Sequence, residues 1–338
     1  MMVQRSDEHQ PRRVLVLGGT GTIGRATVRA LLARGHEVVC LVRPVTGEAH
    51  PSSSAAAAIA KAGAELRTCD VTDPASLARD GIRGERFDVM LSCLAPRTGV
   101  PDGAWRIDHD AHAGALQEAR EAEIPHVILL SAICVQKPRL AFQKAKLAFE
   151  DKLIASGIDY TIVRPTAFFK SLSGQVERVR QGKPFMVFGD GTLTACKPIS
   201  DADLAAYLAD CIDDPERRNR ILPIGGPGAA ITPRMQGERL FAMLGRPPRF
   251  TRVPVAMLDA IILMLATLGR IFPPLRAKAE LARIGRYYAT ESMLVLDPAS
   301  GRYDAEATPS TGSDTLFDYY EQLLRGDETA ERGEHSVF

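Results

Sequence analysis

The feature that most constrains the fold is a glycine-rich turn near the N-terminus. Residues 13–17 form a short apolar run, the sequence GGTGTIG follows, and the next segment carries apolar residues at helical spacing as far as Gly35. Gly18, Gly21 and Gly24 therefore lie between a predicted strand and a predicted helix. Glycines in this context let the backbone approach a pyrophosphate, and the N–H groups at the start of the helix bind its charge. The turn predicts a dinucleotide-binding site.

The rest of the first half alternates strands with helices. Helical patterns at residues 103–123 and 139–156 separate short runs rich in β-branched residues, an alternation typical of a parallel sheet covered on both faces. The further runs are residues 37–42, 65–69, 88–92, 126–131 and 159–163. The sequence therefore predicts an α/β fold, a Rossmann-type doubly wound parallel sheet, with the dinucleotide-binding domain over residues 12–165.

The second half has a different pattern. From Arg164 onward proline and glycine become frequent, and the alternation returns only around residues 197–225, which we expect to rejoin the sheet. A smaller, mainly substrate-binding region is expected over residues 166–325, and a flexible tail over residues 326–338.

Composition excludes several classes of protein. With 42 Lys+Arg and 41 Asp+Glu the formal net charge is +1, so the positive charge of a protein that binds mainly nucleic-acid phosphates is missing. Six scattered cysteines without a C-x-x-C pair indicate reduced thiols. His109 and His112 share a helix face but have no third ligand nearby, so no metal site is expected. Residues 1–12 hold no secretory signal or transit peptide, which favours a cytoplasmic location.

The end of the second predicted strand indicates which dinucleotide binds. An acidic residue there, about twenty residues beyond the glycines, is typical of NAD sites because it accepts from the ribose 2′-hydroxyl. Here the strand EVVCLV ends in Arg43, whose guanidinium can pair with a 2′-phosphate, and Arg25 can add to it. We expect NADPH rather than NADH; the alternative is that Arg43 is a solvated loop residue.

The other cofactor contacts follow from the expected topology. Ligands bind at the carboxyl ends of parallel strands, so residues after the third strand should lie near the adenine and those after the fourth near the nicotinamide half. The predicted cofactor-binding residues are Gly18, Thr20, Gly21, Thr22, Ile23, Gly24, Arg25, Arg43, Asp70, Val71, Ser92, Cys93, Leu94, Ser131, Lys146 and Pro165.

The helix after the fifth strand lacks a familiar proton donor. Extended short-chain dehydrogenases carry Tyr-x-x-x-Lys there, with the tyrosine as proton donor and the lysine on the nicotinamide ribose. This chain has Phe142 and Lys146 at those positions, one turn apart on one face. Lys146 can still bind the ribose, but a phenyl ring cannot protonate an alkoxide. The pair argues against carbonyl reduction and favours reduction of an activated C=C bond; the alternative is a protein that only senses NADP(H).

Several longer blocks are more specific than the glycine turn. The blocks are SCLAPR (92–97), LLSAICVQKP (129–138), FQKAKLAFE (142–150), IVRPTAFFKSLSGQVE (162–177), FGDG (188–191), CKPIS (196–200), LPIGGPG (222–228) and IGRYYATESMLVLDP (284–298). Read together, they resemble the 8-vinyl reductase family of chlorophyll and bacteriochlorophyll biosynthesis, an atypical short-chain dehydrogenase branch near the NmrA-like and isoflavone-reductase-like proteins. Phe142 in place of the tyrosine is typical of that family.

The resemblance implies an activity. It implies NADPH-dependent reduction of the C8 vinyl group of divinyl chlorophyllide a, or of divinyl protochlorophyllide a, to ethyl, the magnesium travelling in the pigment. Our chemical hypothesis is that hydride reaches the terminal vinyl carbon and an acid or water protonates the inner carbon. Plant members carry a long N-terminal transit region that this sequence does not show, so a bacterial enzyme is expected. The rival functions are an NmrA-type regulator without catalysis and an isoflavone-reductase-like reductase of a phenolic substrate.

Candidate substrate contacts lie in the second half. Lys170, just past the sixth strand, is our candidate for the acid or for a contact to a substrate carboxylate, which completes the catalytic set with Lys146 and the Phe142 position. Phe168 and Phe169 can form one wall of a flat pigment pocket, because aromatic faces stack on a macrocycle. Tyr287 and Tyr288 can form a second wall. In each case the alternative is ordinary core packing.

An apolar segment, residues 255–268, is followed by a basic stretch. A helix of that length spans about 20 Å, short of the ~30 Å hydrocarbon core of a membrane. It can lie on a membrane surface, cover the site, or be buried, and a buried helix is the interpretation that we favour. The basic residues that follow it are Arg270, Arg276, Lys278, Arg283 and Arg286, with only Glu280 opposing them.

Overall fold

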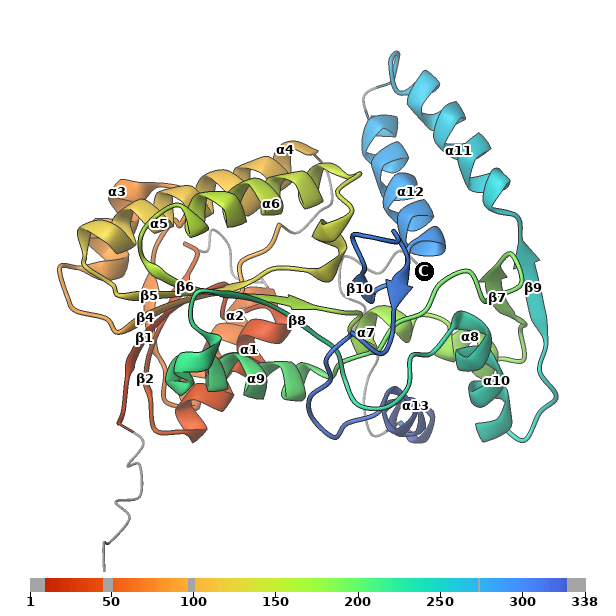
Figure 1. Cartoon of the computed structure of the whole chain (residues 1–338), viewed down its shortest axis with the longest axis horizontal. Coiled ribbons are helices and arrows are strands. Elements are labelled where there is room, and N and C mark those ends of the chain that lie inside the picture. The colour runs from red at the N-terminus through yellow and green to blue at the C-terminus, as the bar shows by residue number, and fades with distance from the viewer. Residues whose placement is uncertain (1–9, 45–50, 97–100, 273, 327–338) are drawn as a thin grey trace, which may run out of the picture.

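Seven parallel strands form the central sheet of this computed structural model, which describes residues 10–44, 51–96, 101–272 and 274–326 (Figure 1). The strand order is β3-β2-β1-β4-β5-β6-β8, and each neighbouring pair is parallel. The predicted Rossmann-type α/β fold is therefore confirmed. The strands are β1 (Arg13–Leu17), β2 (Glu37–Val42), β3 (Glu65–Thr68), β4 (Val89–Ser92), β5 (His126–Leu130), β6 (Asp159–Pro165) and β8 (Arg220–Ile224).

Helices cover both faces of the sheet (Figure 1). Because side chains alternate along a strand, Val14 and Val16 of β1 pack with the core under α1 and α9, whereas Leu15 and Leu17 pack with the core under α5 and α6. One layer holds α1 (Thr22–Ala33), α2 (Pro51–Lys61) and α9 (Asp201–Asp213). The other holds α3 (Pro74–Ser76), the π-helical η1 (Leu77–Ile82), α4 (Pro101–Ala104), the π-helical η2 (Trp105–Ala111), α5 (His112–Glu121) and α6 (Ala141–Ile154).

The C-terminal region packs around a third hydrophobic core, and a few residues of the first half also contribute to it. Ile133, in the 3-10 turn η3 (Ile133–Gln136), and Leu140, just before α6, are buried among Phe169, Tyr287 and Tyr320. Between α9 and β8 lies the 3-10 turn η4 (Pro215–Arg217). The remaining elements are α7 (Phe169–Leu172), α8 (Val176–Arg180), β7 (Phe185–Phe188), α10 (Pro233–Met243), β9 (Phe250–Val253), α11 (Val255–Leu268), α12 (Pro274–Thr290), β10 (Val295–Leu296), β11 (Tyr303–Asp304) and α13 (Leu316–Arg325).

The apolar segment 255–268 is helical, but its surroundings differ from expectation. It forms α11, and none of its residues is buried. The interpretation as a buried helix is therefore wrong. α11 packs lengthwise on α12 and makes few contacts with any other described element (Figure 1). Among the described helices, none combines the length and the apolar character needed to cross a membrane.

Candidate cofactor and active site

The glycine turn between β1 and α1 packs too tightly for side chains at two positions. Gly18 has φ +75°, and a Cβ there would lie 2.7 Å from the backbone of Cys93 and Leu94. A Cβ on Gly24 would lie 2.2 Å from the carbonyl oxygen of Gly18. Gly21 is the N-cap of α1 and offers no side-chain cap, so the first N–H groups of the helix are left for a ligand. The close-packed turn and the uncapped helix fit a bound pyrophosphate.

Lys170 lies beside this turn. Its Nζ donates a hydrogen bond of 3.3 Å to Oγ1 of Thr22, in the first turn of α1. The structure thus joins a residue of α7 to the dinucleotide turn across 148 positions of sequence. Sequence reasoning did not anticipate this contact, because no local pattern reports a partner so far along the chain.

Two predicted cofactor residues lie at the ends of neighbouring strands. Arg43 follows β2 and is exposed, and Asp70 follows β3. The Asp70 carboxylate accepts hydrogen bonds from the N–H of Thr72 (2.9 Å) and from its hydroxyl (2.7 Å). These bonds hold the pKa of Asp70 below its ordinary value, and the charges of Arg106 and Arg43 add to the shift. The adjoining Val71 is buried. Arg43 therefore stands at the carboxyl edge of the sheet with its charge toward Asp70.

The end of β4 is organised by a buried histidine. Ser92 Oγ lies 2.8 Å from Nε2 of His112, and the N–H of Leu94 donates to the same hydroxyl at 3.3 Å. Nδ1 of His112 lies 2.7 Å from the carbonyl oxygen of Ile107. Cys93 Sγ lies 3.8 Å from Oγ1 of Thr27 in α1. The Ser92 side chain faces inward and fixes the loop that the Gly18 backbone touches.

Two buried histidines make stability depend on pH. Burial, with the nearby Lys146 charge, lowers the pKa of His112 to about 3, and burial lowers that of His126 to about 4. In the unfolded chain both bind a proton near pH 6.5, so the unfolded state holds more protons below that pH. The free energy of unfolding should fall as the pH drops from about 6.5 to about 4, by up to ~1.4 kcal/mol per pH unit for each histidine. Denaturant unfolding at several pH values measures this slope.

A substitution isolates the His112 contribution. His112→Gln keeps a polar group opposite Ser92. It should remove roughly half of the slope of the free energy of unfolding against pH. His109→Gln is the matched control, because His109 is on the same segment but partly exposed, beside Asp110. An equal slope in the His112 variant and the wild type would contradict the assignment.

Lys146 on α6 is held by a buried carboxylate. Its Nζ lies 3.0 Å from Oδ1 of Asp108, whose side chain is 1% exposed, and the lysine side chain is 13% exposed. Asp108 comes from η2, a π-helical segment that sequence periodicity did not distinguish from an ordinary helix. Phe142, one turn earlier on α6, packs partly buried against the C-terminal core. The Asp108 carboxylate fixes where the Lys146 ammonium can point.

A second buried charge network lies behind the end of β5. Ser131 Oγ donates to Oε1 of Glu150, and the Arg164 guanidinium pairs with the same carboxylate through Nε at 3.1 Å and through Nη2. Glu150 is 1% exposed. Ser131, a predicted cofactor residue, thus directs its hydroxyl to Glu150, and its contact with the cofactor stays a prediction. Pro165, also expected there, ends β6 one residue beyond Arg164.

The four aromatic candidates for a pigment pocket differ in exposure. Phe168 packs on the core beneath the sheet, and Phe169 is buried, with its ring centroid 5.7 Å from that of Tyr319. Tyr287 is buried and donates to the carbonyl oxygens of Cys134 (3.0 Å) and Lys137 (3.2 Å). Tyr288 is 38% exposed, with its hydroxyl 4.0 Å from Cys134 Sγ. Of the four, Tyr288 offers the most accessible ring, and the substrate roles of all four stay predictions.

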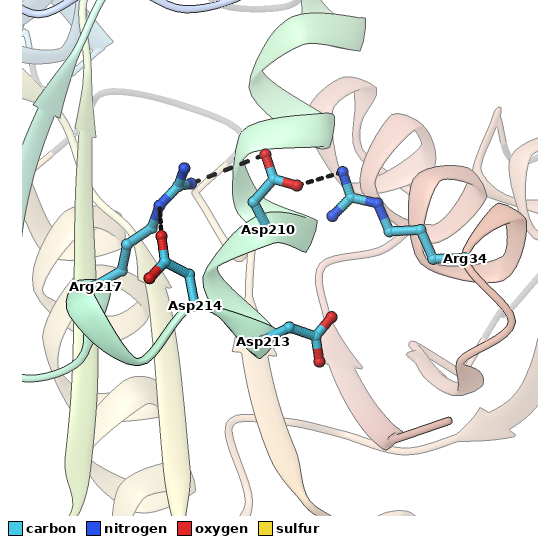
Figure 2. A pocket seen from close by; sticks show the side chains of 5 residues that line it. All are labelled: Arg34, Asp210, Asp213, Asp214 and Arg217. Carbon is cyan, nitrogen blue, oxygen red and sulfur yellow. Dashed lines mark hydrogen bonds and ion pairs between the residues drawn. The ribbon is translucent and has the colours of Figure 1, made fainter. Parts of the chain in front are cut away.

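A charged cleft lies at the opposite edge of the sheet. It has a volume of about 660 Å³ and is lined by Arg34, Asp210, Asp213, Asp214 and Arg217 (Figure 2). Arg34 pairs with Asp210 at 2.6 Å and Arg217 with Asp214 at 2.9 Å. These residues sit at the C-terminal ends of α1 and α9 and in η4, away from the glycine turn, and two of the three aspartates are paired with the two arginines. The cleft is a salt-bridged surface feature outside the cofactor site.

The chain matches known dinucleotide-binding enzymes. Residues 18–215 match the NAD(P)H-binding protein family. The chloroplastic divinyl chlorophyllide a 8-vinyl-reductase of Oryza sativa subsp. indica is 50% identical over 331 residues, covering 96% of this chain and 82% of that protein. Its counterpart in Arabidopsis thaliana is 47% identical over 319 residues, covering 92% and 76%. The chain belongs to the divinyl chlorophyllide a 8-vinyl-reductase family.

The fold comparison agrees with this membership. The NADPH complex of leucoanthocyanidin reductase from Vitis vinifera superposes with a TM-score of 0.68 at 14% identity, covering 93% of this chain and 99% of that one. The predicted 8-vinyl-reductase family, the enzyme class and the nicotinamide dinucleotide site are confirmed by these matches. All six cysteines are free thiols, as expected.

The expected location is corrected by the same comparison. A cytoplasmic location was predicted from the composition of residues 1–12, and a bacterial enzyme from the transit region of the plant members, whereas the 8-vinyl-reductase relatives are named chloroplastic plant proteins. The prediction is wrong because the composition of residues 1–12 describes only those residues and does not determine where the protein is located.

Proposed function

We propose that this chain reduces the C8 vinyl group of divinyl chlorophyllide a to ethyl with NADPH. The observation that carries the proposal is the combination of the close-packed glycine turn with 50% identity to a named 8-vinyl-reductase over almost the whole chain. Divinyl protochlorophyllide a is the alternative pigment, and it differs outside the vinyl group. The absence of a tyrosine at position 142 suits this reaction, since no alkoxide has to be protonated.

Different residues are proposed to bind different parts of NADPH. NADPH supplies the hydride when bound. The α1 N-terminus and the glycine turn bind the pyrophosphate, Arg43 contacts the 2′-phosphate, and Lys146, oriented by Asp108, contacts the nicotinamide ribose. Lys170 stands at the boundary between this site and the C-terminal region.

Lys170 is proposed to contact NADPH as well as the pigment. Because its ammonium lies beside Thr22, Lys170→Met should raise the KM for NADPH at least about tenfold, the loss of one charge-assisted hydrogen bond. A proton-donor role would appear instead as a fall in kcat with the KM for NADPH unchanged. Steady-state kinetics with NADPH varied distinguish the two, and unchanged values of both constants would remove Lys170 from either role.

Cofactor preference tests the role of Arg43. Arg43→Asp replaces the cation proposed to face the 2′-phosphate by a repelling anion, so the preference for NADPH over NADH in kcat/KM should fall by at least about 100-fold. Arg29→Asp on the exposed face of α1 is the control for a simple change in net charge. An unchanged preference in the Arg43 variant would place the phosphate contact elsewhere.

The activity itself is tested with purified protein, NADPH and divinyl chlorophyllide a. The expected product is heavier by two hydrogen atoms and has a blue-shifted Soret band, with NADPH consumed in equal amount. If folded protein binds NADPH but changes neither this pigment nor divinyl protochlorophyllide a, the proposal fails. Binding of NADPH and NADP⁺ without turnover of any pigment would then favour a regulator of the NmrA type.

A further inference from the structure

Helices α11 and α12 form a hairpin that projects from the C-terminal region (Figure 1). Large apolar side chains of α11 face solvent: Leu263 is 70% exposed and Met264 53%. At the turn of the hairpin, Ile271 is 73% exposed and Phe272 58%. Met257, Met264 and Leu268 follow one another at helical spacing, Leu263 lies beside them, and Ile271 and Phe272 follow the end of α11. We call these six exposed side chains the apolar stripe.

Positive charge surrounds the tip of this hairpin. Its sequence contains five cations and two acids. Both acids are paired within the hairpin, Asp259 with Arg286 and Glu280 with Arg283. The cations that remain, Arg270, Arg276 and Lys278, are exposed and lie within eight residues of Phe272. The tip therefore combines large apolar side chains with net positive charge.

We propose that the α11–α12 hairpin docks on the surface of an anionic lipid bilayer. The apolar stripe would enter the boundary between headgroups and acyl chains, while the three tip cations contact lipid phosphates. α11 is about 20 Å long at 1.5 Å per residue, which suits a helix lying in the plane of the interface. Large apolar side chains that are exposed together in this way mark an interaction site.

Charge favours lipid over a second copy of the chain. A two-fold contact through the tip would place Arg270, Arg276 and Lys278 of one subunit against the same residues of the other, since such contacts are self-complementary. Like charges across an interface repel, whereas the phosphates of an anionic bilayer neutralise them. The other end of α12 carries Tyr287 and Tyr288, so the docked hairpin would connect the bilayer with the candidate pigment region; this consequence rests on the proposed function.

The test is co-sedimentation of the full chain with vesicles. Wild type should bind phosphatidylcholine vesicles that contain phosphatidylglycerol and bind pure phosphatidylcholine weakly. Arg270→Gln with Lys278→Gln should lower partitioning about 25-fold, roughly fivefold for each cation. Phe272→Ser should lower it at least about tenfold through lost apolar burial. Because these side chains are exposed, the variants should keep the wild-type unfolding midpoint.

Matched controls and the opposing results complete the design. Ile154→Ser and Arg302→Gln remove an exposed apolar side chain and an exposed cation elsewhere, and they should leave vesicle binding unchanged. The proposal is overturned if wild type ignores phosphatidylglycerol vesicles or if the tip variants bind like wild type. It is also overturned if wild type is a dimer in solution that Phe272→Ser dissociates. Neither pigment nor NADPH is present in this assay, so its failure is distinct from a failure of the reductase activity.

Discussion

Gly24→Ala should weaken NADPH binding at least about 100-fold in an otherwise folded chain. The added Cβ would lie 2.2 Å from the Gly18 carbonyl oxygen and 2.8 Å from the Gly19 Cα, both backbone atoms that can move only if the turn opens. A displacement of about 1 Å at a positioning element can cost about 100-fold. We therefore expect the dissociation constant for NADPH, measured by fluorescence titration, to rise at least about 100-fold. The free energy of unfolding should fall by about 1–3 kcal/mol from overpacking.

A helix variant separates these two effects. Arg29→Gly lies on the exposed face of α1 and should cost about 1 kcal/mol of stability through helix propensity alone. It should bind NADPH like wild type, because it leaves the turn intact. If Gly24→Ala binds NADPH normally, the turn is not the pyrophosphate site.

Lys146→Met should lower both stability and turnover. Asp108, 1% exposed, would lose the cation that lies 3.0 Å from its carboxylate, and breaking a buried pair in this way costs about 3–5 kcal/mol. Loss of the proposed ribose contact should lower kcat/KM for NADPH about 100-fold. Chemical denaturation and steady-state kinetics measure the two effects separately.

A double variant separates the contribution of Lys146 to stability from its contribution to turnover. Lys146→Met with Asp108→Asn removes the unpaired buried charge and should regain most of the lost stability. Turnover should stay low, because the ammonium is still missing. Recovery of activity together with stability would mean that Lys146 only neutralises Asp108.

Local patterns predicted the parts of the site that are built locally. The apolar run of β1, the glycines and the start of α1 are adjacent in sequence, and alternation of strands with helices determines a parallel sheet with one cofactor edge. The contact of Lys170 with Thr22 and the pairing of Lys146 with Asp108 join separate elements. Spacing within one element carries no information about such partners.

The error at α11 has a related cause. Fourteen residues with almost no polar side chain indicate that the segment avoids water. They do not indicate which apolar surface covers it. A helix buried inside the protein and a helix that contacts an external apolar surface have the same apolar sequence pattern. Only the placement of α11 beyond β9, packed mainly on α12 among the described elements, distinguishes them.

The late return of the chain to the sheet has a consequence for biosynthesis. Leu204, Leu208 and Ile212 of α9 belong to the core on the α1 side of the sheet, and β8 completes the edge beside β6. α9 begins 36 residues and β8 begins 55 residues after the end of β6, so the part of this face that α9 covers stays open to water until then. The emerging chain therefore presents a hydrophobic surface during this interval of its synthesis, and such a surface is prone to aggregation.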